Sequence, residues 1–446
     1  MDISVIGTGY VGLVSGVCLA EKGHRVICVD NDAAKVARIS RGESPIYEEG
    51  LDDLLTRHIG SRVEATTDLK RAVEETRLTL IAVGTPFDGE AIDLRYVQQV
   101  AREIGTALKD KDAYHVVVVK STVIPGTTDD VVLPILEEHS GKRAGRDFGL
   151  GMNPEFLREG SAIRDFLEPD RIVLGGIDET TRNVLGQVYE PFAGVDMLRT
   201  NNRTAEMIKY SANSLLATLI SFSNEIGNLC ARIGGVDVVE VMRGVHLDKR
   251  LSPISGDGQR IMPDITTYLA AGCGFGGSCF PKDVKALIAH GKQLGLGMDL
   301  LEAVIDVNQR QPFQVLELAR KHVADFSGVS FGILGLAFKP GTDDMRESPA
   351  IPVIRELLAQ GGRVAAYDPV ARHEAEKIFP AHQVRYCDSI RETVQDADVV
   401  LLLTRWDLFD QVPQLLGEMT DPPVLIDGRR MLHREDVPRY EGIGLS

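Results

Sequence analysis

Residues 2–30 read DISVIGTGYVGLVSGVCLAEKGHRVICVD, and this stretch decides the fold. An apolar run is followed by a glycine turn, an amphipathic segment with helical spacing, and a second apolar run. This order predicts a strand, a helix and a parallel strand packed as one β-α-β unit. The glycines Gly7, Gly9 and Gly12 stand between the first strand and the helix.

Each of these glycines has its own physical role in a dinucleotide site. Gly7 permits the tight turn, Gly9 lets a diphosphate approach the backbone, and Gly12 lets helix and strand pack closely. Unpaired N–H groups and the helix dipole favour the diphosphate at the helix N-terminus. Asp30 ends the second strand, where its carboxylate would accept hydrogen bonds from a ribose diol and repel a 2′-phosphate. The sequence therefore predicts an NAD site, and a β-α-β unit with an unoccupied glycine turn is the alternative.

The rest of the chain repeats this alternation at both ends. Apolar strand candidates alternate with helical patterns, which indicates parallel sheets covered on both faces. The strand candidates are 78–86, 115–123, 170–176, 329–338, 363–368, 398–404 and 423–428. We expect an α/β protein with two Rossmann-like, doubly wound parallel-sheet domains joined by a long central helix. The expected parts are an NAD-binding domain (1–200), a helical connector and dimerisation region (201–325) and a C-terminal Rossmann-like domain (326–446).

The central part begins with a long stretch with helical spacing, which starts at Thr204 and has no proline before Gly234 and Gly235. A helix of roughly 29 residues would be about 44 Å long. Apolar residues surround most of its circumference, so it needs partners on several sides. This pattern predicts a central helix shared with a second subunit, in a homodimer or a higher oligomer.

Composition excludes several classes of function. The chain has 446 residues, of which 43% are hydrophobic, and a net charge of −16. The negative charge argues against non-specific binding of nucleic acid and against an anionic membrane surface. The six cysteines do not form the pattern of a disulfide framework. With no signal-peptide pattern and no long apolar run, we expect a cytoplasmic protein without a membrane partner.

The segment GCGFGGSCFPKD (272–283) concentrates thiols, glycines and a Lys-Asp pair. Pro281 suits the first position of a helix, which places Cys279 just before a helix N-terminus, where a thiolate is favoured. Asp283 falls in the first turn of that helix. Cys273 and Cys279 are too few ligands for a structural zinc site, and a disulfide is disfavoured in a reducing compartment. We expect no metal here, and the choice lies between a nucleophilic Cys279 and a thiol that only packs in a glycine turn.

Lys209 and Asn213 are four residues apart in the long helical stretch and therefore share one face. A lysine that extends to solvent beside a surface amide is the simpler interpretation of such a pair. The segments Ser121-Thr122 and Asn153-Pro154-Glu155-Phe156-Leu157 point to a site instead. Ser121-Thr122 ends a strand, and ligands bind at the carboxyl edge of parallel sheets.

Together these motifs resemble the nucleotide-sugar 6-dehydrogenase family, the UDP-glucose/GDP-mannose dehydrogenases. The matching stretches run nearly end to end. They are GTGYVG, SPIYEEGL (44–51), VGTP (83–86), KSTVIPGT (120–127), NPEFLREGSAIRDF (153–166), AEMIKYSANSLLA (205–217), GFGGSCFPKDV (274–284), FKPGTDDMRESPA (338–350) and DGRR (427–430).

The resemblance implies two successive NAD-dependent oxidations that convert a sugar C6 alcohol into a carboxylate. By resemblance, Cys279 attacks the intermediate aldehyde, and the thiohemiacetal becomes a thioester that water hydrolyses. Lys209 and Asn213 would stabilise the oxyanions, and Asp283 would transfer protons with an ordered water. Glu155 and Thr122 would position water and cofactor for hydrolysis.

Further positions carry binding roles by the same resemblance, which also implies that the C-terminal domain (326–446) is the nucleotide-sugar-binding domain. The implied cofactor-binding residues, besides the glycines and Asp30, are Tyr10, Val11, Lys35, Thr85, Thr122, Glu159 and Arg346. The implied substrate-binding residues are Glu155, Phe156, Leu157, Lys209, Asn213, Arg250, Arg260, Tyr268, Phe275, Gly276, Lys339 and Arg429.

The chain departs from the family pattern at residues 251–264, where it is longer. Either Arg250 or Arg260 is then the equivalent of a family arginine that reaches toward the neighbouring subunit's site. DGRR and TRWDLF (404–409) favour UDP-glucose, oxidised to UDP-glucuronate, over GDP-mannose. GDP-mannose or UDP-N-acetylhexosamine oxidation, a two-electron β-hydroxyacid-type reaction, and a catalytically silent NAD-binding scaffold are the alternatives.

Overall fold

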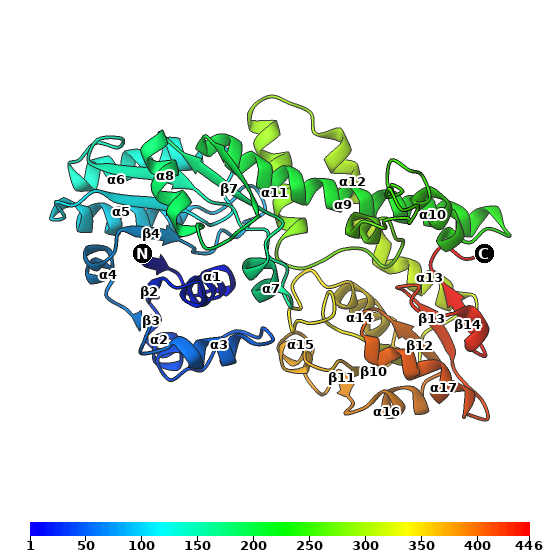
Figure 1. Ribbon diagram of the computed structural model, residues 1–446. Coiled ribbons are helices and arrows are strands. Elements are labelled where there is room, and N and C mark those ends of the chain that lie inside the picture. Colours follow the sequence, from blue (N-terminus) through cyan, green and yellow to red (C-terminus); the bar gives the residue numbers. More distant parts are fainter. The chain divides into compact units, whose positions relative to one another are not determined.

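The computed structural model describes residues 1–446 and divides them into two compact units, Met1–Ala212 and Asn213–Ser446 (Figure 1). Each unit contains its own sheet and its own hydrophobic core. The boundary falls inside the longest helix, α9 (Asn202–Ile233), which is 32 residues long. The predicted fold class, two α/β domains with doubly wound sheets and a long connecting helix, is confirmed.

The sheet of the first unit has eight strands in the order β3-β2-β1-β4-β5-β6-β7-β8. Their bounds are β1 Asp2–Ile6, β2 Arg25–Val29, β3 Val63–Thr66, β4 Leu78–Ile81, β5 His115–Val119, β6 Phe148–Met152, β7 Arg171–Gly176 and β8 Asp196–Thr200. All neighbours pair in parallel except β6 and β7, which are antiparallel through the pair Gly151 and Gly176. Strands β3, β6 and β8 were not among the sequence predictions.

Helices cover both faces of this sheet. Along β2, Val26 and Cys28 belong to one hydrophobic cluster, and Ile27 and Val29 belong to another. Successive residues of a strand point to opposite faces, so two separate cores enclose the sheet. The helices of this unit are α1 Tyr10–Glu21, α2 Ala33–Ser40, α3 Leu51–His58, α4 Leu69–Glu75, α5 Arg95–Lys109, the π-helical turn η1 Thr127–Val132, α6 Leu133–Ser140, α7 Ala162–Leu167 and α8 Glu179–Val188.

The second unit holds an all-parallel sheet of six strands in the order β11-β10-β9-β12-β13-β14. The strands are β9 Ser330–Leu334, β10 Arg363–Tyr367, β11 Val384–Tyr386, β12 Val399–Leu402, β13 Val424–Asp427 and β14 Tyr440–Gly442. Its α-helices are α10 Val238–His246, α11 Phe280–Gln293, α12 Asp299–Arg310, α13 Gln314–Arg320, α14 Ala350–Ala359, α15 Arg372–Ile378, α16 Ile390–Gln395 and α17 Val412–Gly417. Short 3₁₀ turns are η2 Asp264–Tyr268, η3 Gln311–Phe313, η4 Asp407–Gln411 and η5 Arg434–Asp436.

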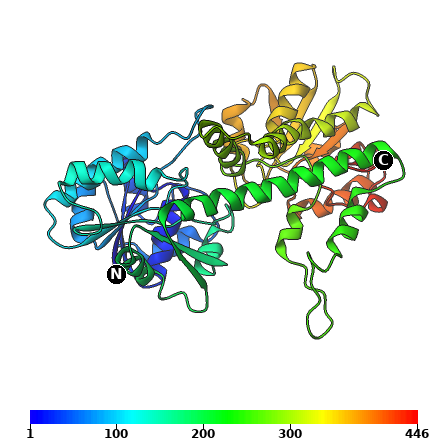
Figure 2. The ribbon, with the colours of Figure 1, turned by 90° about the horizontal axis from the view of Figure 1, so that it is seen from above.

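Residues 251–264, where an insertion was expected from the sequence, lie in a loop that we call the arm (Figure 2). The arm follows α10 and closes on itself through an antiparallel bridge between Ile254 and Arg260. Ile254, Ile261 and Met262 of the arm are exposed. No helix in the chain combines the length and the apolar character needed to cross a membrane.

Candidate active site

The glycine turn between β1 and α1 has the geometry that a diphosphate requires. Gly7 has φ +98°, a conformation that side chains disfavour. A Cβ added to Gly12 would lie 1.9 Å from the carbonyl oxygen of Gly7, so only glycine allows this packing. Around Gly9, in contrast, no atom lies within 4 Å of an added Cβ, and Tyr10 begins α1 directly afterwards. The open space at a helix N-terminus fits the diphosphate of NAD.

Asp30 follows β2, as predicted, and is bound to the glycine turn. Its carboxylate accepts hydrogen bonds from Thr8 N (2.9 Å), Thr8 Oγ1 (2.7 Å) and Asp32 N (3.0 Å). Burial raises the pKa of Asp30, but the Thr8 hydroxyl and these N–H groups more than compensate and lower it below its usual value. Asp30 is therefore an anion that holds the turn, with Lys35 nearby in the first turn of α2.

Tyr10, the first residue of α1, contacts the loop that contains Glu159, and both residues were expected near the cofactor. The Tyr10 hydroxyl donates to Glu48, and Gly160 N donates to the same hydroxyl at 2.9 Å. Gly160 also donates to Glu48 at 2.7 Å, so this carboxylate fixes the backbone just after Glu159. Glu48 was not predicted, and its place in the SPIYEEGL motif was the one signal that could have found it.

The ends of β4 and β5 bring another predicted pair together. Thr85 Oγ1 donates to the carbonyl oxygen of Thr122 at 2.7 Å, and Ser121 Oγ donates to the carbonyl oxygen of Val83 at 2.6 Å. Both segments follow parallel strands, at the edge of the sheet where nucleotides bind.

A buried ion pair joins Lys209 to Glu155. Lys209 Nζ lies 2.9 Å from Glu155 Oε1, and the two residues are 3% and 7% exposed. Burial raises the pKa of Glu155, but the Lys209 ammonium and the hydrogen bond from Leu157 N (2.6 Å) outweigh burial and hold the pKa low. The Lys209 ammonium also lies 5.5 Å from the centre of the Phe156 ring. The predicted residues Glu155, Phe156, Leu157 and Lys209 therefore form one cluster in the first unit.

Glu206, three residues before Lys209 on α9, was missed by the sequence analysis. Its fully buried carboxylate accepts hydrogen bonds from Gly126 N (2.6 Å), Thr128 N (2.8 Å) and Thr128 Oγ1 (2.6 Å). Burial raises the pKa of Glu206 to about 7, because those three bonds only partly offset the loss of water. Glu206 fastens α9 to the turn that follows β5.

Glu206 makes a pH-dependent contribution to stability. Because its pKa is higher in the folded than in the unfolded chain, the folded state binds more protons between about pH 4.5 and 7, and stability falls as pH rises through that window. At roughly 1.4 kcal/mol per pKa unit, the free energy of unfolding falls by up to about 3 kcal/mol across this window. We expect Glu206→Gln to flatten this part of the curve of thermal midpoint against pH. Parallel curves for wild type and variant would show that Glu206 does not titrate there.

In the second unit, the predicted thiol lies where the sequence placed it. Cys279 is the N-cap residue of α11, Pro281 is the second residue of that helix, and Asp283 N donates to the Cys279 carbonyl oxygen at 2.8 Å. Ser278 Oγ lies 3.6 Å from Cys279 Sγ, and Cys279 is partly exposed. Cys273, in contrast, is completely buried and donates to the carbonyl oxygen of Leu403 at 3.5 Å. Only one of the two thiols is therefore accessible.

Asp283 is held between two partners and is 1% exposed. Asn213 Nδ2 donates to Asp283 Oδ2 at 2.6 Å, and Lys282 Nζ lies 2.6 Å from Asp283 Oδ1. The structure thus joins two predicted catalytic residues, Asn213 and Asp283, in one hydrogen bond. Lys282 was not predicted, although it stands in the PKD motif.

The glycine loop before Cys279 packs against the segment that follows β9. A Cβ added to Gly276 would lie 2.2 Å from the carbonyl oxygen of Glu347, and one added to Gly277 would lie 2.7 Å from the Phe338 ring. Gly277 N donates to the carbonyl oxygen of Arg346 at 2.8 Å. Glu347 has φ +53°, a strained value for a side chain other than glycine, and it pairs with Lys285 of α11 at 3.2 Å.

Arg429 connects the same loop to the second sheet. Its guanidinium donates to the carbonyl oxygens of Leu403 (2.7 Å), Gly274 (2.9 Å) and Phe338 (3.4 Å). Lys339 follows Phe338, its ammonium 5.7 Å from that ring centre, and the Arg346 guanidinium binds Asp344 at 2.8 Å. These predicted binding residues therefore surround one loop, at the edge where β9, β12 and β13 end.

The aromatic residues Phe275 and Tyr268 flank the start of α11. Their ring centres lie 6.0 and 6.3 Å from that of Phe280. Arg250 lies outside this group and pairs with Asp248 at 2.5 Å, with a largely exposed side chain. Arg260 donates to the carbonyl oxygens of Leu247 (2.9 Å) and Ser252 (2.7 Å) and holds the arm in its turn.

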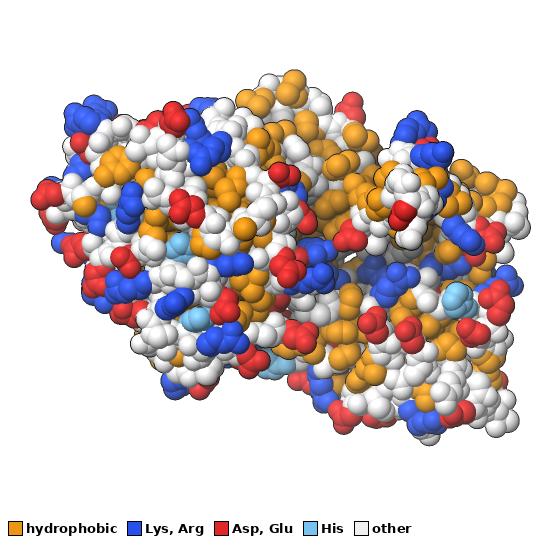
Figure 3. Space-filling view, in the orientation of Figure 1, with side chains coloured by type: hydrophobic (Ala, Val, Ile, Leu, Met, Phe, Trp, Pro, Cys, Tyr) orange, Lys and Arg blue, Asp and Glu red, His pale blue; other side chains and the backbone are white.

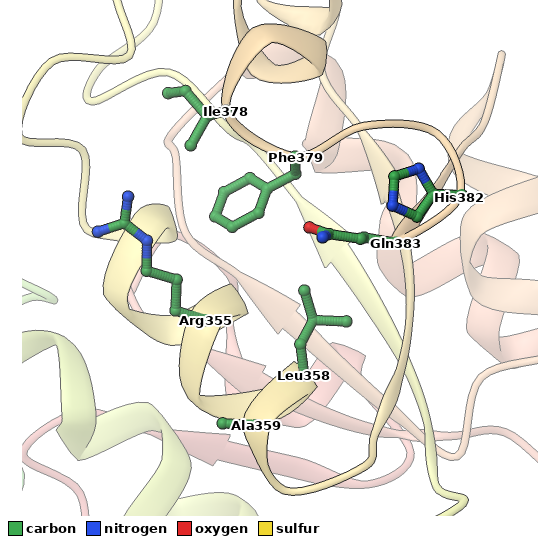
Figure 4. A pocket seen from close by; sticks show the side chains of 7 residues that line it. All are labelled: Arg355, Leu358, Ala359, Ile378, Phe379, His382 and Gln383. Carbon is green, nitrogen blue, oxygen red and sulfur yellow. The ribbon is translucent and has the colours of Figure 1, made fainter.

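A groove of about 600 Å³ lies elsewhere in the second unit, beside Arg355, Phe379, His382 and Gln383 (Figure 4). It lies at the C-terminal ends of α14 and α15, which is the edge where the parallel strands begin. Nucleotides bind at the opposite edge of such sheets, and none of the predicted site residues lines the groove.

The glycine turn, the acidic residue after the second strand and the doubly wound sheet define the class of NAD-dependent dehydrogenases. Family models match almost the whole chain: the NAD binding domain at residues 1–193, the central domain at 203–310 and the UDP binding domain at 332–434. The chain belongs to the UDP-glucose/GDP-mannose dehydrogenase family. It is an oxidoreductase that uses NAD.

Known relatives match over 92% or more of their length. The chain is 42% identical to the UDP-glucose 6-dehydrogenase AglM of Haloferax volcanii (99% of this chain, 100% of the relative) and 41% identical to TuaD of Bacillus subtilis (99% and 93%), also a UDP-glucose 6-dehydrogenase. It is 39% identical to a GDP-mannose 6-dehydrogenase of Pseudomonas syringae (92% of both). Among solved structures, a UDP-glucose dehydrogenase from Pyrobaculum islandicum has a TM-score of 0.89 at 40% identity (100% of this chain, 98% of that chain).

Proposed function

We propose that this enzyme oxidises the C6 alcohol of UDP-glucose to the carboxylate of UDP-glucuronate in two NAD-dependent steps. The observation that carries the proposal is the partly exposed Cys279 at the N-terminus of α11, one turn before the buried Asp283. A two-electron dehydrogenase has no use for such a thiol, whereas a four-electron enzyme must hold an aldehyde between its two oxidations. The UDP-glucose 6-dehydrogenases among the relatives support the choice of sugar.

The proposed reaction steps start from the C6 alcohol of the sugar. NAD, when bound, accepts a hydride in each of the two oxidations. The first oxidation leaves an aldehyde, and the Cys279 thiolate adds to its carbonyl carbon to form a thiohemiacetal. Loss of the second hydride from that carbon gives a thioester. Water then attacks the thioester, the C–S bond breaks, and the carboxylate leaves with the thiolate restored.

The other side chains have roles that follow from their charges. Lys209 and Asn213 stand one turn apart on α9 and donate to the oxyanion of each tetrahedral stage. Asp283 accepts a proton through an ordered water, and its hydrogen bond to Asn213 orients both groups. Glu155 and Thr122 position the hydrolytic water and the cofactor.

The remaining site residues divide between the two ligands. The glycine turn, Tyr10, Val11, Asp30, Lys35, Thr85, Glu159 and Arg346 bind NAD in this proposal. Lys339 and Arg429 bind the nucleotide sugar from the second sheet, together with Phe275, Gly276 and Tyr268. Either Arg250, directly before the arm, or Arg260, within it, completes the substrate site.

We further propose that the chain forms a homodimer through α9. Leu215, Phe222 and Leu229 are spaced seven residues apart on this helix, and each is about half exposed. Apolar side chains also gather over neighbouring helices of the same face (Figure 3). A second copy would cover such a stripe, because exposed apolar stripes are characteristic of interfaces. Light scattering with size separation measures the molar mass, and a monomer at micromolar concentration would contradict the dimer.

The test of the reaction is the ratio of NADH formed to sugar consumed. We expect two NADH per UDP-glucose, with UDP-glucuronate identified by mass spectrometry. One NADH per sugar would refute the four-electron mechanism. The same assay with UDP-N-acetylglucosamine, UDP-galactose, dTDP-glucose and GDP-mannose decides the sugar and the base, and a higher kcat/KM for GDP-mannose would overturn the choice of UDP-glucose.

A further inference from the structure

A second buried lysine lies beside the Lys209–Glu155 ion pair. Lys120 directly follows β5, is 3% exposed and belongs to the first unit, as do its neighbours. The charges of Lys209, which pairs with Glu155, and of Lys120, which does so only through space, both act on this one buried carboxylate. Lys120 follows the apolar run HVVVV and opens the KSTVIPGT motif (120–127), but no role was predicted for it.

A rigid network fixes the position of the Lys120 ammonium. Lys120 Nζ donates to Asn153 Oδ1 at 2.9 Å. The Asn153 amide is itself oriented from two sides, since its Nδ2 donates to the carbonyl oxygen of Val173 at 2.9 Å and its Oδ1 accepts from the Tyr189 hydroxyl. Asn153 is 2% exposed, so the network is closed to water. The Asn153 oxygen, fixed by its own partners, therefore holds the Lys120 ammonium in one place.

The proposed function gives this second charge a task. Lys209 pairs with Glu155 in the structure, but during the reaction its ammonium must serve the substrate oxyanion. If Lys209 were the only cation, this change of partner would leave Glu155 as a buried, uncompensated anion, which is strongly unfavourable. Lys120 is close enough to Glu155 for their charges to attract each other.

We propose that Lys120 is a positioning residue: it compensates the charge of Glu155 and so frees Lys209 for the substrate oxyanion. This inference rests on the proposed function for the role of Lys209. Its effect depends on charge, and not on the shape of the side chain.

The ionisation of Lys120 makes the inference testable. Burial lowers the pKa of Lys120 to about 8, with the attraction of Glu155 opposing burial and the repulsion of Lys209 adding to it. The titratable groups that face Lys120 are Glu155, Lys209 and Tyr189. Burial holds the pKa of Tyr189 far above its usual value, and that of Glu155 is low, so neither gains or loses a proton near pH 8. The wild-type enzyme should therefore lose the assistance of Lys120 above that pH.

The experiment compares Lys120→Met with the wild type across the pH range 6.5 to 9.5. At pH 7 we expect kcat to fall by about 10- to 100-fold with a KM change of less than about threefold. The ratio of the two kcat values should approach one above about pH 9, where the wild-type lysine is also neutral. A ratio that stays constant over the whole range would show a purely structural role and overturn the inference.

Two further variants complete the test. Lys120→Arg keeps its charge at high pH, so its kcat relative to wild type should rise above pH 8, and this decides the question if circular dichroism shows that Lys120→Met is unfolded. Lys111→Met is the matched control, because Lys111 is a half-buried lysine bound only to the carbonyl oxygens of Val73, Glu74 and Thr76. The ratio of the Lys111→Met kcat to the wild-type kcat should not change with pH.

If the wild type forms only one NADH per sugar, the four-electron function fails, but the pH dependence of the first oxidation still decides the role of Lys120.

Discussion

Cys279→Ser is expected to lower the rate of uronate formation by about 10⁴-fold or more, since it removes the proposed nucleophile. A serine hydroxyl at this position stays protonated near neutral pH, so it cannot form the covalent adduct that retains the aldehyde. NAD and UDP-glucose should still bind with Kd values within about threefold of wild type, because Cys279 contributes little binding surface. Calorimetry measures the binding, and mass spectrometry of the product measures the uronate.

The matched control for this prediction is Cys273→Ser. Cys273 is buried, and the serine hydroxyl can keep the hydrogen bond to the Leu403 carbonyl oxygen. We expect kcat to stay within about threefold of wild type, with some loss of stability from placing a hydroxyl in an apolar core. Normal uronate production by Cys279→Ser would remove Cys279 from its role.

Gly276→Ala is expected to lower kcat by about 100-fold, through displacement of the thiol. The added methyl group would lie 2.2 Å from the Glu347 carbonyl oxygen and 3.0 Å from Phe338 Cβ, and neither atom is the mobile end of a side chain. The loop must therefore shift, and Cys279 follows only three residues later. Steady-state kinetics and the thermal midpoint measured together separate a displaced thiol from a general loss of folding.

Gly417→Ala provides the control for the methyl group itself. Gly417 ends α17, and an added Cβ there would have no atom within 4 Å. We expect wild-type kcat and an unchanged or slightly higher thermal midpoint. If Gly276→Ala kept wild-type kcat as well, the contact between the glycine loop and residues 338–347 would not be what positions the thiol.

Local patterns were sufficient for the main elements of the fold. The β1-α1-β2 unit, the strand β5 and the long helix α9 were predicted from apolar spacing and turn residues close in the sequence. Strand β6 was missed, because FGLGM contains two glycines and has low strand propensity. Its glycines are explained by neighbours distant in sequence: a Cβ at Gly149 would lie 2.6 Å from Thr181 Oγ1, and one at Gly151 would lie 2.8 Å from the Gly175 carbonyl oxygen.

The candidate site also contains residues that local patterns predict and residues that depend on neighbours distant in sequence. Spacing alone placed Cys279, Pro281 and Asp283 at the start of a helix, because a helix N-terminus and its first turn involve only neighbouring residues. Their catalytic roles were implied by the family resemblance. Lys120 and Glu206 were missed, since each owes its properties to burial and to partners at least 33 residues away. A lysine in a sequence does not reveal whether water or a fixed amide will surround its ammonium.

The sequence by itself therefore determined the class of fold, the use of NAD and the position of Cys279 directly before a helix, all of which depend on short-range spacing. Only the tertiary structure decided which groups surround them: the Asn213–Asp283 hydrogen bond, the Glu347 carbonyl oxygen over Gly276, and the second buried ammonium beside Glu155. The physical reason is that burial and electrostatic coupling depend on distances in space, which the folded chain sets between residues far apart in sequence.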